Sequence, residues 1–288
     1  MSGERAGGPG TLYVLATPIG NLGDLAPRTA EALQAVGAVA AEDTRRTARL
    51  FAHLGVDAPT LLSLPAFDER GRLEPIVDRL RAGQDVALCT DAGTPGVSDP
   101  GVALVAAAWE AGVRVVAIPG PSAALTALSA SGLPADQFFF AGFLPRKGGA
   151  RAERLAFLRV LPATLVLYEA GNRTGATLVD LAEAFGDRLA VVGRELTKLH
   201  EELARGRLSE LARRFSGEVR GEVTIVVAGG TWPVAPVIEE PLEDELRRRL
   251  AAGEAPSVTA REVARARGLK RAEVYDALER LKGRGARS

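Results

Sequence analysis

Short apolar runs alternate with amphipathic segments over the first 118 residues of the chain. Polar residues bound each run, as expected of a strand that is buried on both faces of a parallel sheet. The segments between the runs repeat their apolar side chains at helical spacing. This alternation predicts a mostly parallel sheet with helices on both faces. The predicted strands are 12–16, 39–41, 60–63, 86–89 and 113–118.

The chain between residues 119 and 232 again combines apolar runs with helical segments, so it predicts a second α/β domain. Its first strand is rich in aromatic residues, and a helix is expected to end near Phe185 and another to cover 208–215. The strands are predicted at 137–143, 163–169, 189–192 and 222–228.

Both ends of the chain and a proline-rich stretch differ from these two domains. Residues 1–10 contain no apolar core, so they predict a flexible leader and no signal peptide. Three prolines between 231 and 241 predict a linker at 233–242. In the tail, 243–288, a capping box at 259–262 begins a helix that ends at Arg267, and a second helix follows over 271–282. This pattern resembles a helix-turn-helix, which is compatible with nucleic-acid binding or with simple packing.

Loops rich in glycine and proline follow three of the predicted strands, at 17–25, 91–98 and 119–123. After the second loop, Asp99 is expected to cap a helix and Pro100 to occupy its first position. One such loop alone is typical of a tight connection. Because the carboxyl ends of parallel strands share one edge of a sheet, several such loops together favour a ligand site there.

The sequence lacks the motifs that several classes of enzyme need. The first loop and the acidic pair Glu42 and Asp43 imitate a dinucleotide-binding unit, but a GxGxxG run is absent. The sequence also shows no phosphate-binding GxxxxGK[ST] run and no Ser-His-Asp grouping. A loop-lined crevice with few reactive side chains suits a co-substrate that carries its own leaving group.

Composition narrows the choice of partners. The 36 basic and 36 acidic residues cancel, so affinity for nucleic acid must come from local patches. The single cysteine, Cys89, excludes an internal disulfide, and with two histidines it argues against a zinc site. No run approaches the roughly 20 apolar residues that span a bilayer. We therefore expect a cytoplasmic protein without membrane or metal.

Basic residues gather at two places. Five Lys or Arg and one Glu lie between residues 146 and 159, and the tail holds twelve basic and eight acidic residues. The first group is typical of a solvated helix face. It is also compatible with a contact to phosphates, because Gly148 and Gly149 would leave its cations mobile until an anion binds.

Seven motifs, in order, resemble the tetrapyrrole methylase superfamily, and within it the bacterial small-subunit ribosomal RNA methyltransferases that modify a cytidine 2′-oxygen. The resemblance extends over 12–228, and the tail resembles the helical C-terminal domain of that family. The motifs are ATPIGNLGDL (16–25), AEDTR (41–45), DAGTPGVSDPG (91–101), PGPSA (119–123), GFLPRK (142–147), YEAGNR (168–173) and RELTK (194–198).

The resemblance implies two α/β domains with S-adenosylmethionine in a cleft between them, a homodimer, and 2′-O-methylation of a cytidine in 16S ribosomal RNA. The donor-binding residues that it implies are Ile19, Asp91, Thr94, Val97, Ser122, Ala123, Tyr168, Leu196 and Ala228. Arg45, Arg146, Lys147 and Arg173 are expected to contact the RNA substrate.

Methyl transfer to a ribose hydroxyl requires alignment of the reacting atoms and, late in the reaction, a base. Glu169 is the favoured base, with Arg194 and Lys198 binding phosphates or lowering the pKa of the hydroxyl. The other candidate bases are Asp91, Glu42 and Asp43, and each carboxylate is equally compatible with a cap or an ion pair.

Three residues depart from the pattern of the resembling family. Leu64 and Phe67 stand where polar His and Asn are expected, and Asn172 stands where a His is usual. These departures concern how the acceptor nucleotide is bound. The alternatives are a methylase of a tetrapyrrole or corrinoid, and a nucleic-acid-binding protein without catalysis.

Overall fold

A computed structural model of the chain describes residues 8–230, 241–267 and 269–285. The chain divides into two compact units, Met1–Thr231 and Trp232–Ser288. Most of the predicted leader (1–10) and of the predicted linker (233–242) lies outside the described residues. No helix in the described ranges combines the length and the apolar composition needed to cross a bilayer.

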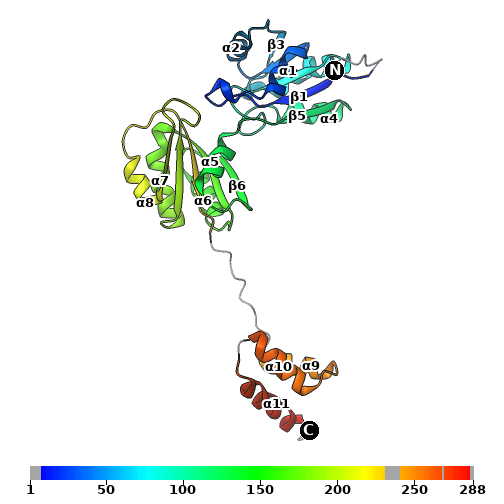
Figure 1. The fold of residues 1–288 in the computed structure, drawn as a ribbon, viewed down its shortest axis with the longest axis vertical. Coiled ribbons are helices and arrows are strands. Elements are labelled where there is room, and N and C mark those ends of the chain that lie inside the picture. Colours follow the sequence, from blue (N-terminus) through cyan, green and yellow to red (C-terminus); the bar gives the residue numbers. More distant parts are fainter. Residues whose placement is uncertain (1–7, 231–240, 268, 286–288) are drawn as a thin grey trace. The chain divides into compact units, whose positions relative to one another are not determined.

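The first sheet of the larger unit has the strand order β3-β2-β4-β1-β5, and all its pairs are parallel (Figure 1). Side chains of α1 and α2 pack on one face, and side chains of α3 and α4 pack on the other. The predicted parallel sheet with helices on both faces is therefore confirmed. The elements are β1 (Thr11–Leu15), α1 (Pro27–Ala35), β2 (Ala38–Ala41), α2 (Thr44–Leu54), β3 (Thr60–Ser63), α3 (Leu73–Arg81), β4 (Val86–Cys89), α4 (Val102–Glu110) and β5 (Arg114–Ile118).

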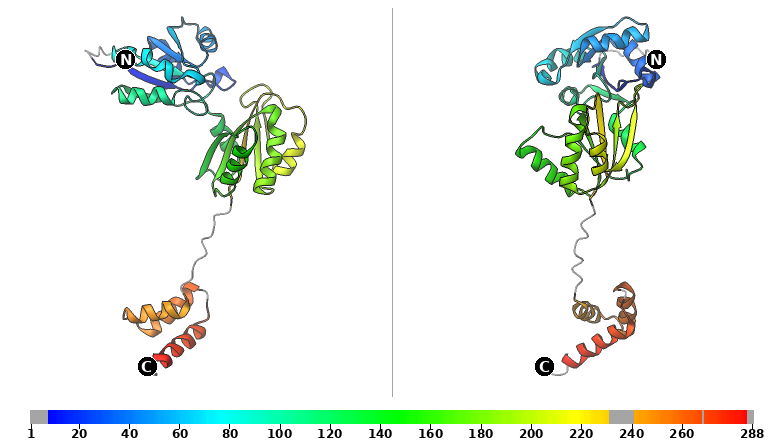
Figure 2. Two further views of the ribbon diagram at one scale, coloured as in Figure 1. Left: turned by 180° about the vertical axis from the view of Figure 1, so that it is seen from behind. Right: turned by 90° about the vertical axis from the view of Figure 1, so that its left-hand side faces the viewer.

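The second sheet of this unit is mixed, with the order β6-β7-β10-β8-β9 (Figures 1 and 2). Only β6 and β7 pair in parallel, and β10 runs antiparallel to both of its neighbours. Its edge strand β9 is absent from the sequence-based prediction, because its polar residues give no apolar run. The elements are α5 (Ala123–Ser131), β6 (Phe138–Phe143), α6 (Gly149–Arg159), β7 (Thr164–Ala170), α7 (Thr174–Phe185), β8 (Leu189–Arg194), β9 (Glu202–Arg207), α8 (Leu208–Arg214) and β10 (Glu222–Val227).

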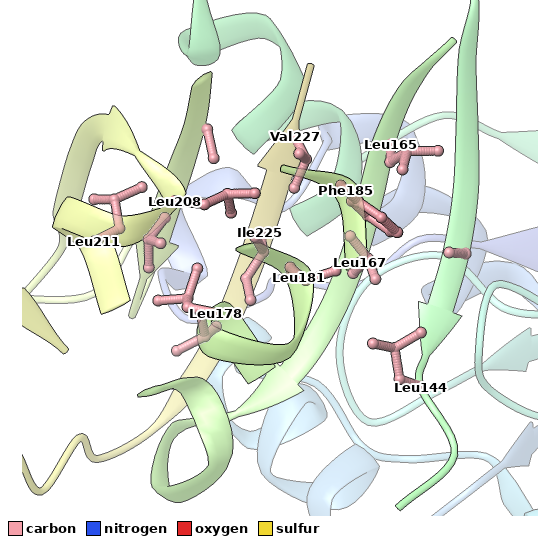
Figure 3. Close-up of a cluster of buried hydrophobic side chains, with 14 of the residues drawn as sticks. Leu144, Leu165, Leu167, Leu178, Leu181, Phe185, Leu208, Leu211, Ile225 and Val227 are labelled. Carbon is pink, nitrogen blue, oxygen red and sulfur yellow. The ribbon is translucent and has the colours of Figure 1, made fainter. Parts of the chain in front are cut away.

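The two faces of the second sheet differ in how they are covered. Side chains of α6, α7 and α8 form a large apolar core on one face, including Leu178 and Leu181 of α7 and Leu211 of α8 (Figure 3). On the other face α5 packs against Val166, Val191 and Val226. A single helix covers that face, which leaves room beside it for the cavity described below.

The smaller unit contains α9 (Leu242–Ala251), α10 (Pro256–Arg267) and α11 (Arg271–Gly285). Helix α9 is missing from the prediction, and α10 begins three residues before the predicted cap. Thr259 is buried inside α10, where its hydroxyl donates to the Ala255 carbonyl at 3.2 Å. The apolar spacing of the tail predicts a shared core of Val263, Leu269, Val274, Leu278 and Leu281. Val263, Val274 and Leu278 form this core and Leu281 packs against it, whereas Leu269 is exposed.

The start of α4 differs from the sequence-based prediction in a way that affects the site. The helix begins at Val102 after Gly101, whose φ of 131° favours glycine, so Asp99 is not its cap. The cap comes from a distant carboxylate. Glu69 Oε1 accepts hydrogen bonds from the backbone N–H groups of Gly101, Ala103 and Leu104 at 3.0, 2.8 and 3.1 Å. The side chain of Asp99 therefore does not cap α4.

We expect Glu69→Ala to destabilise the larger unit by about 2 kcal/mol, because three backbone donors at the start of α4 lose a charged acceptor. Asp68→Ala is the matched control, since it removes only an exposed ion pair with Arg72 at 2.9 Å, which is worth about 0–1 kcal/mol. Urea unfolding of the full chain measures both. Equal midpoints for the two variants would show that Glu69 does not hold the start of α4.

Candidate functional site

A cavity of about 380 Å³ is lined by residues from both sheets of the larger unit. The segments after β1, β2, β4 and β5 contribute to it, together with the carboxyl ends of β6, β7 and β8 and the start of β10. This volume is in the range of small-molecule sites. Apolar side chains such as Ile19, Val97 and Leu196 line it beside several carboxylates.

Hydrogen bonds join the glycine- and proline-rich loops to one another. Thr17 and Gly93 exchange two backbone hydrogen bonds, at 2.9 and 3.0 Å. The hydroxyl of Thr94 donates to the carbonyl of Pro121 at 3.1 Å. The backbone N–H of Ala124 donates to the hydroxyl of Tyr168, on β7, at 3.2 Å. All three loops therefore hold one another in place, and the last bond fixes them to the second sheet.

Strained backbone conformations gather at the same place. Among the described residues, Ser98, Glu195 and Thr197 are those other than glycine with a positive φ, of 65°, 51° and 67°. Ser98 and Glu195 line the cavity, and Thr197 lies between lining residues. Such conformations cost about 1–3 kcal/mol each and cluster at functional sites. Their position supports a functional role for the cavity.

The cavity is acidic. Burial is the main reason why the pKa of Asp99 is raised to about 6, and the negative charges of Glu42, Asp91 and Glu222 add to this effect. Burial also raises the pKa of Glu42. Within the described part of the chain, the carboxylate of Asp99 has no hydrogen bond and no ion pair. A desolvated, unpaired carboxylate of this kind suits a cationic ligand or a hydroxyl donor.

Eight of the nine residues predicted to bind the methyl donor line this one cavity, namely Ile19, Asp91, Thr94, Val97, Ser122, Ala123, Tyr168 and Leu196. The structure does not bring Ala228 there. Because β10 runs antiparallel to β7, its carboxyl end lies at the opposite edge of the sheet, where Val227 pairs with Leu165. The start of β10 supplies Glu222, Val223 and Thr224 to the cavity instead.

The predicted catalytic residues differ in how their charges are used. Glu169 lines the cavity but is only 2% exposed. Its carboxylate accepts hydrogen bonds from the Thr177 hydroxyl at 2.6 Å and from the Ala170 N–H at 2.9 Å. It also lies 3.4 Å from Arg173. Its role as a base stays a prediction, and its oxygens are already engaged by the protein.

The two predicted catalytic cations are paired with carboxylates. Lys198 lines the cavity, and its Nζ donates to Glu195 at 2.9 Å and to Glu222 at 3.0 Å. Arg194, at the end of β8, is not among the lining residues, and its Nε donates to Glu202 at 3.0 Å. Their catalytic roles also stay predictions.

The predicted RNA-contacting cations lie around the cavity rather than in it. Arg45 is exposed and donates two side-chain hydrogen bonds to Asp43, at 3.0 and 2.7 Å. These bonds lower the pKa of Asp43. Arg46, the residue after Arg45, lines the cavity. Arg146 and Lys147 are exposed on the loop after β6 and have no charged partner within the described residues.

Sequence reasoning missed Asp99, Phe143, Glu195 and Glu222 as cavity residues. The Asp-Pro pair at 99–100 is typical of a helix start, and the glycine that follows it was the available sign against that interpretation. The three departures from the family pattern lie elsewhere. Leu64 is buried in the core of the first sheet, while Phe67 (90% exposed) and Asn172 are on the surface.

Comparison with protein families gives a match to "Tetrapyrrole (Corrin/Porphyrin) Methylases" over residues 11–212. Among curated proteins, the chain is 49% identical to a Xylella fastidiosa protein named ribosomal RNA small subunit methyltransferase I, over 81% of this chain and 86% of the relative. A protein of the same name from Micromonospora olivasterospora is 50% identical, over 93% of this chain and 86% of the relative. The counterpart from Synechocystis is 45% identical, over 92% and 96%.

Solved structures share the fold at low sequence identity. Diphthine synthase superposes with a TM-score of 0.60 at 18% identity, covering 76% of this chain and 90% of its own. Uroporphyrin-III C-methyl transferase from Thermus thermophilus, complexed with S-adenyl homocysteine, gives a TM-score of 0.55 at 21% identity, covering 76% and 97%.

We expect Asp99→Asn to stabilise the chain without ligand by about 1 kcal/mol at pH 7.5, since solvent screens this half-buried group. The folded pKa of about 6 exceeds the ordinary value of 3.8, so ionising Asp99 costs stability. The penalty is absent below about pH 4 and complete above pH 6, so stability falls as the pH rises through this window. The variant should lose this dependence.

Thermal unfolding of both proteins between pH 4 and 8 measures the difference. Asp68→Asn, which changes an exposed carboxylate, is the control and should leave the pH dependence unchanged. A difference between the Asp99 variant and the original chain that is the same at pH 4.5 and 7.5 would contradict the assignment.

Proposed function

Because the chain belongs to the tetrapyrrole (corrin/porphyrin) methylase family, we propose that it transfers a methyl group from S-adenosylmethionine to a ribose hydroxyl of small-subunit ribosomal RNA. The acceptor is a cytidine 2′-oxygen of the 16S RNA, in the naked RNA or in the assembled subunit. The names of relatives that are 45–50% identical over most of the chain support small-subunit ribosomal RNA as the acceptor, whereas the cytidine 2′-oxygen is what the family resemblance implies. The observation that carries the proposal is the gathering of eight predicted donor-binding residues around one acidic cavity.

The cavity fits the donor in chemistry as well as in size. When bound, S-adenosylmethionine supplies a methyl group on a positively charged sulfur atom, so it needs apolar walls and nearby negative charge. Ile19, Val97 and Leu196 provide the walls, while Asp91 and Glu42 provide negative charge on the side of the first sheet. The bent loops bring backbone amides and carbonyls close to the ligand, which is how a site with few reactive side chains orients it.

The protein's own chemical task is to accept one proton. As the ribose oxygen forms its bond to the methyl carbon, the carbon–sulfur bond of the donor breaks and its electron pair stays on sulfur in the product S-adenosylhomocysteine. The ribose oxygen loses its proton, which passes to a carboxylate and then to solvent. Asp99 is the proton acceptor in this proposal, because its carboxylate lines the cavity and is free of protein partners in the described ranges. Glu169 holds the end of β7 through its hydrogen bonds with Ala170 and Thr177, and its role as a base stays a prediction.

The cations around the cavity have two roles in this proposal: some bind the RNA substrate, and others hold carboxylates of the protein. Arg146 and Lys147 are free to bind phosphates, and Arg45 and Arg173 add positive charge beside the cavity. Lys198 keeps Glu195 and Glu222 in place at the edge of the cavity, and Arg194 pairs with Glu202, which does not line it.

We also propose that the protein works in the cytoplasm as a homodimer, as the family resemblance implies. Exposed apolar side chains on one part of the first α/β half support a protein interface there, since Phe67, Val102 and Trp109 are 90%, 63% and 64% exposed.

The proposed activity predicts that labelled S-adenosylmethionine transfers label to the ribose of unmodified small subunits or their RNA. Scintillation counting and mapping of the modified nucleotide measure it. Label on a tetrapyrrole and none on RNA would favour the small-molecule methylase instead. Absence of donor binding by calorimetry would favour a nucleic-acid-binding protein without catalysis.

Asp99→Asn is expected to lower the rate of RNA methylation by about a hundredfold, the lower range for loss of a general base. In the original chain kcat/KM should fall as the pH drops through about 6, because Asp99 then binds the proton it has to accept. The variant should lack this decline. Asp68→Asn serves as the control, and an Asp99 variant with an unchanged rate would remove this residue from the mechanism.

A further inference from the structure

Phe143 is an exposed aromatic residue at the edge of the cavity. It is the last residue of β6, lines the cavity and is 57% exposed. Its ring lies 5.7 Å from that of Tyr168 in an edge-to-face arrangement, and Tyr168 makes a similar contact with Phe140 at 5.0 Å. One edge of the Phe143 ring is thus supported by protein, while more than half of the side chain remains open to solvent.

A β-bulge brings Phe143 to this side of the sheet. Phe139 and Ala141 pack into the core beneath α6 and α7, so strict alternation would also place Phe143 there. The pairing with β7 shifts between Phe140 and Gly142, and Phe143 then pairs with Tyr168 on the cavity face. Gly142 has a φ of 62°, which suits the bulge. One extra residue therefore turns this ring from the core to the cavity.

The chain directly after Phe143 is anchored and then becomes free. Leu144 is buried in the core, and Arg151 donates to the carbonyl of Pro145 at 3.0 Å. Arg151 is itself held by Asp180 at 2.7 Å. The next residues, Arg146 and Lys147, are exposed and form no ion pair within the described segments. An aromatic ring at the cavity is thus followed, three residues later, by exposed cations.

This arrangement matches what an unstacked nucleotide requires. A ribose hydroxyl can enter a cavity of this size only when its nucleotide leaves the RNA stack, and the base then needs a new stacking partner. An aromatic face supplies that partner for any base, and neighbouring cations bind the flanking phosphates.

We propose that Phe143 is the platform on which the base of the methylated nucleotide stacks, with Arg146 and Lys147 binding the adjacent phosphates. The inference rests on the proposed RNA-methylating function and assigns the acceptor side of the same site. Phe143 is then a substrate-contacting residue, and it does not bind the methyl donor.

The test compares Phe143→Leu, Phe143→Tyr and Phe138→Leu in the full chain, with unmodified small subunits as acceptor. Phe143→Leu should lower kcat/KM for RNA by about tenfold to a hundredfold, the loss expected when one base loses an aromatic stacking partner. Phe143→Tyr should restore most of it, because the ring is kept. Phe138, at the other end of β6 and 43% exposed, is the matched control and should have no effect.

Calorimetry with S-adenosylmethionine separates the possible outcomes. Unchanged donor affinity in all variants, together with the loss in RNA methylation, supports the platform and shows that the variants fold. A Leu variant with the original kcat/KM, a Tyr variant as poor as the Leu variant, or a loss of donor affinity would each overturn the inference. If the original chain methylates no RNA, the proposed function itself fails, which is a distinct result.

Discussion

The two backbone hydrogen bonds between Thr17 and Gly93 are the contact on which the site depends. They join the first loop to the second at the point where β1 and β4 end. The second loop is in turn bonded to the third through Thr94 and Pro121. Without these bonds, three flexible segments rich in glycine would each have to be ordered by the ligand, at a conformational cost of about 1–2 kcal/mol per residue. The protein orders them when it folds.

The sequence predicted the first sheet well because its strands appear as apolar runs, which in β2 and β4 are buried along their whole length. It predicted most of the cavity for the same reason, since loops after parallel strands meet at one edge. The rule failed for Ala228, because the antiparallel direction of β10 could not be predicted from its apolar residues alone. It also missed β9, in which charged residues interrupt the apolar ones and leave no apolar run.

The helix cap of α4 shows a different limit. The Asp-Pro pair at 99–100 has the local pattern of a helix start, but the chain supplies the cap from Glu69, about thirty residues earlier in sequence. Local patterns report what a residue can do, and the tertiary fold decides which of the available carboxylates does it. Because Glu69 takes the structural task, Asp99 stays unpaired in a partly desolvated cavity. That position costs stability, and such a cost is tolerated where an unpaired charge serves a function.

In the basic segment after β6, too, the tertiary fold decides which of several similar residues is used by the protein itself. Between residues 146 and 159 the sequence contains five cations that look alike. Arg151 is buried and bonded to Asp180 and Thr177, and Arg154 lies 5.4 Å from the ring centroids of both Phe139 and Phe157. These contacts separate Arg151 and Arg154, which hold the fold, from Arg146 and Lys147, which remain available to a phosphate. The charge that matters for recognition is the part of the patch that the protein does not itself use.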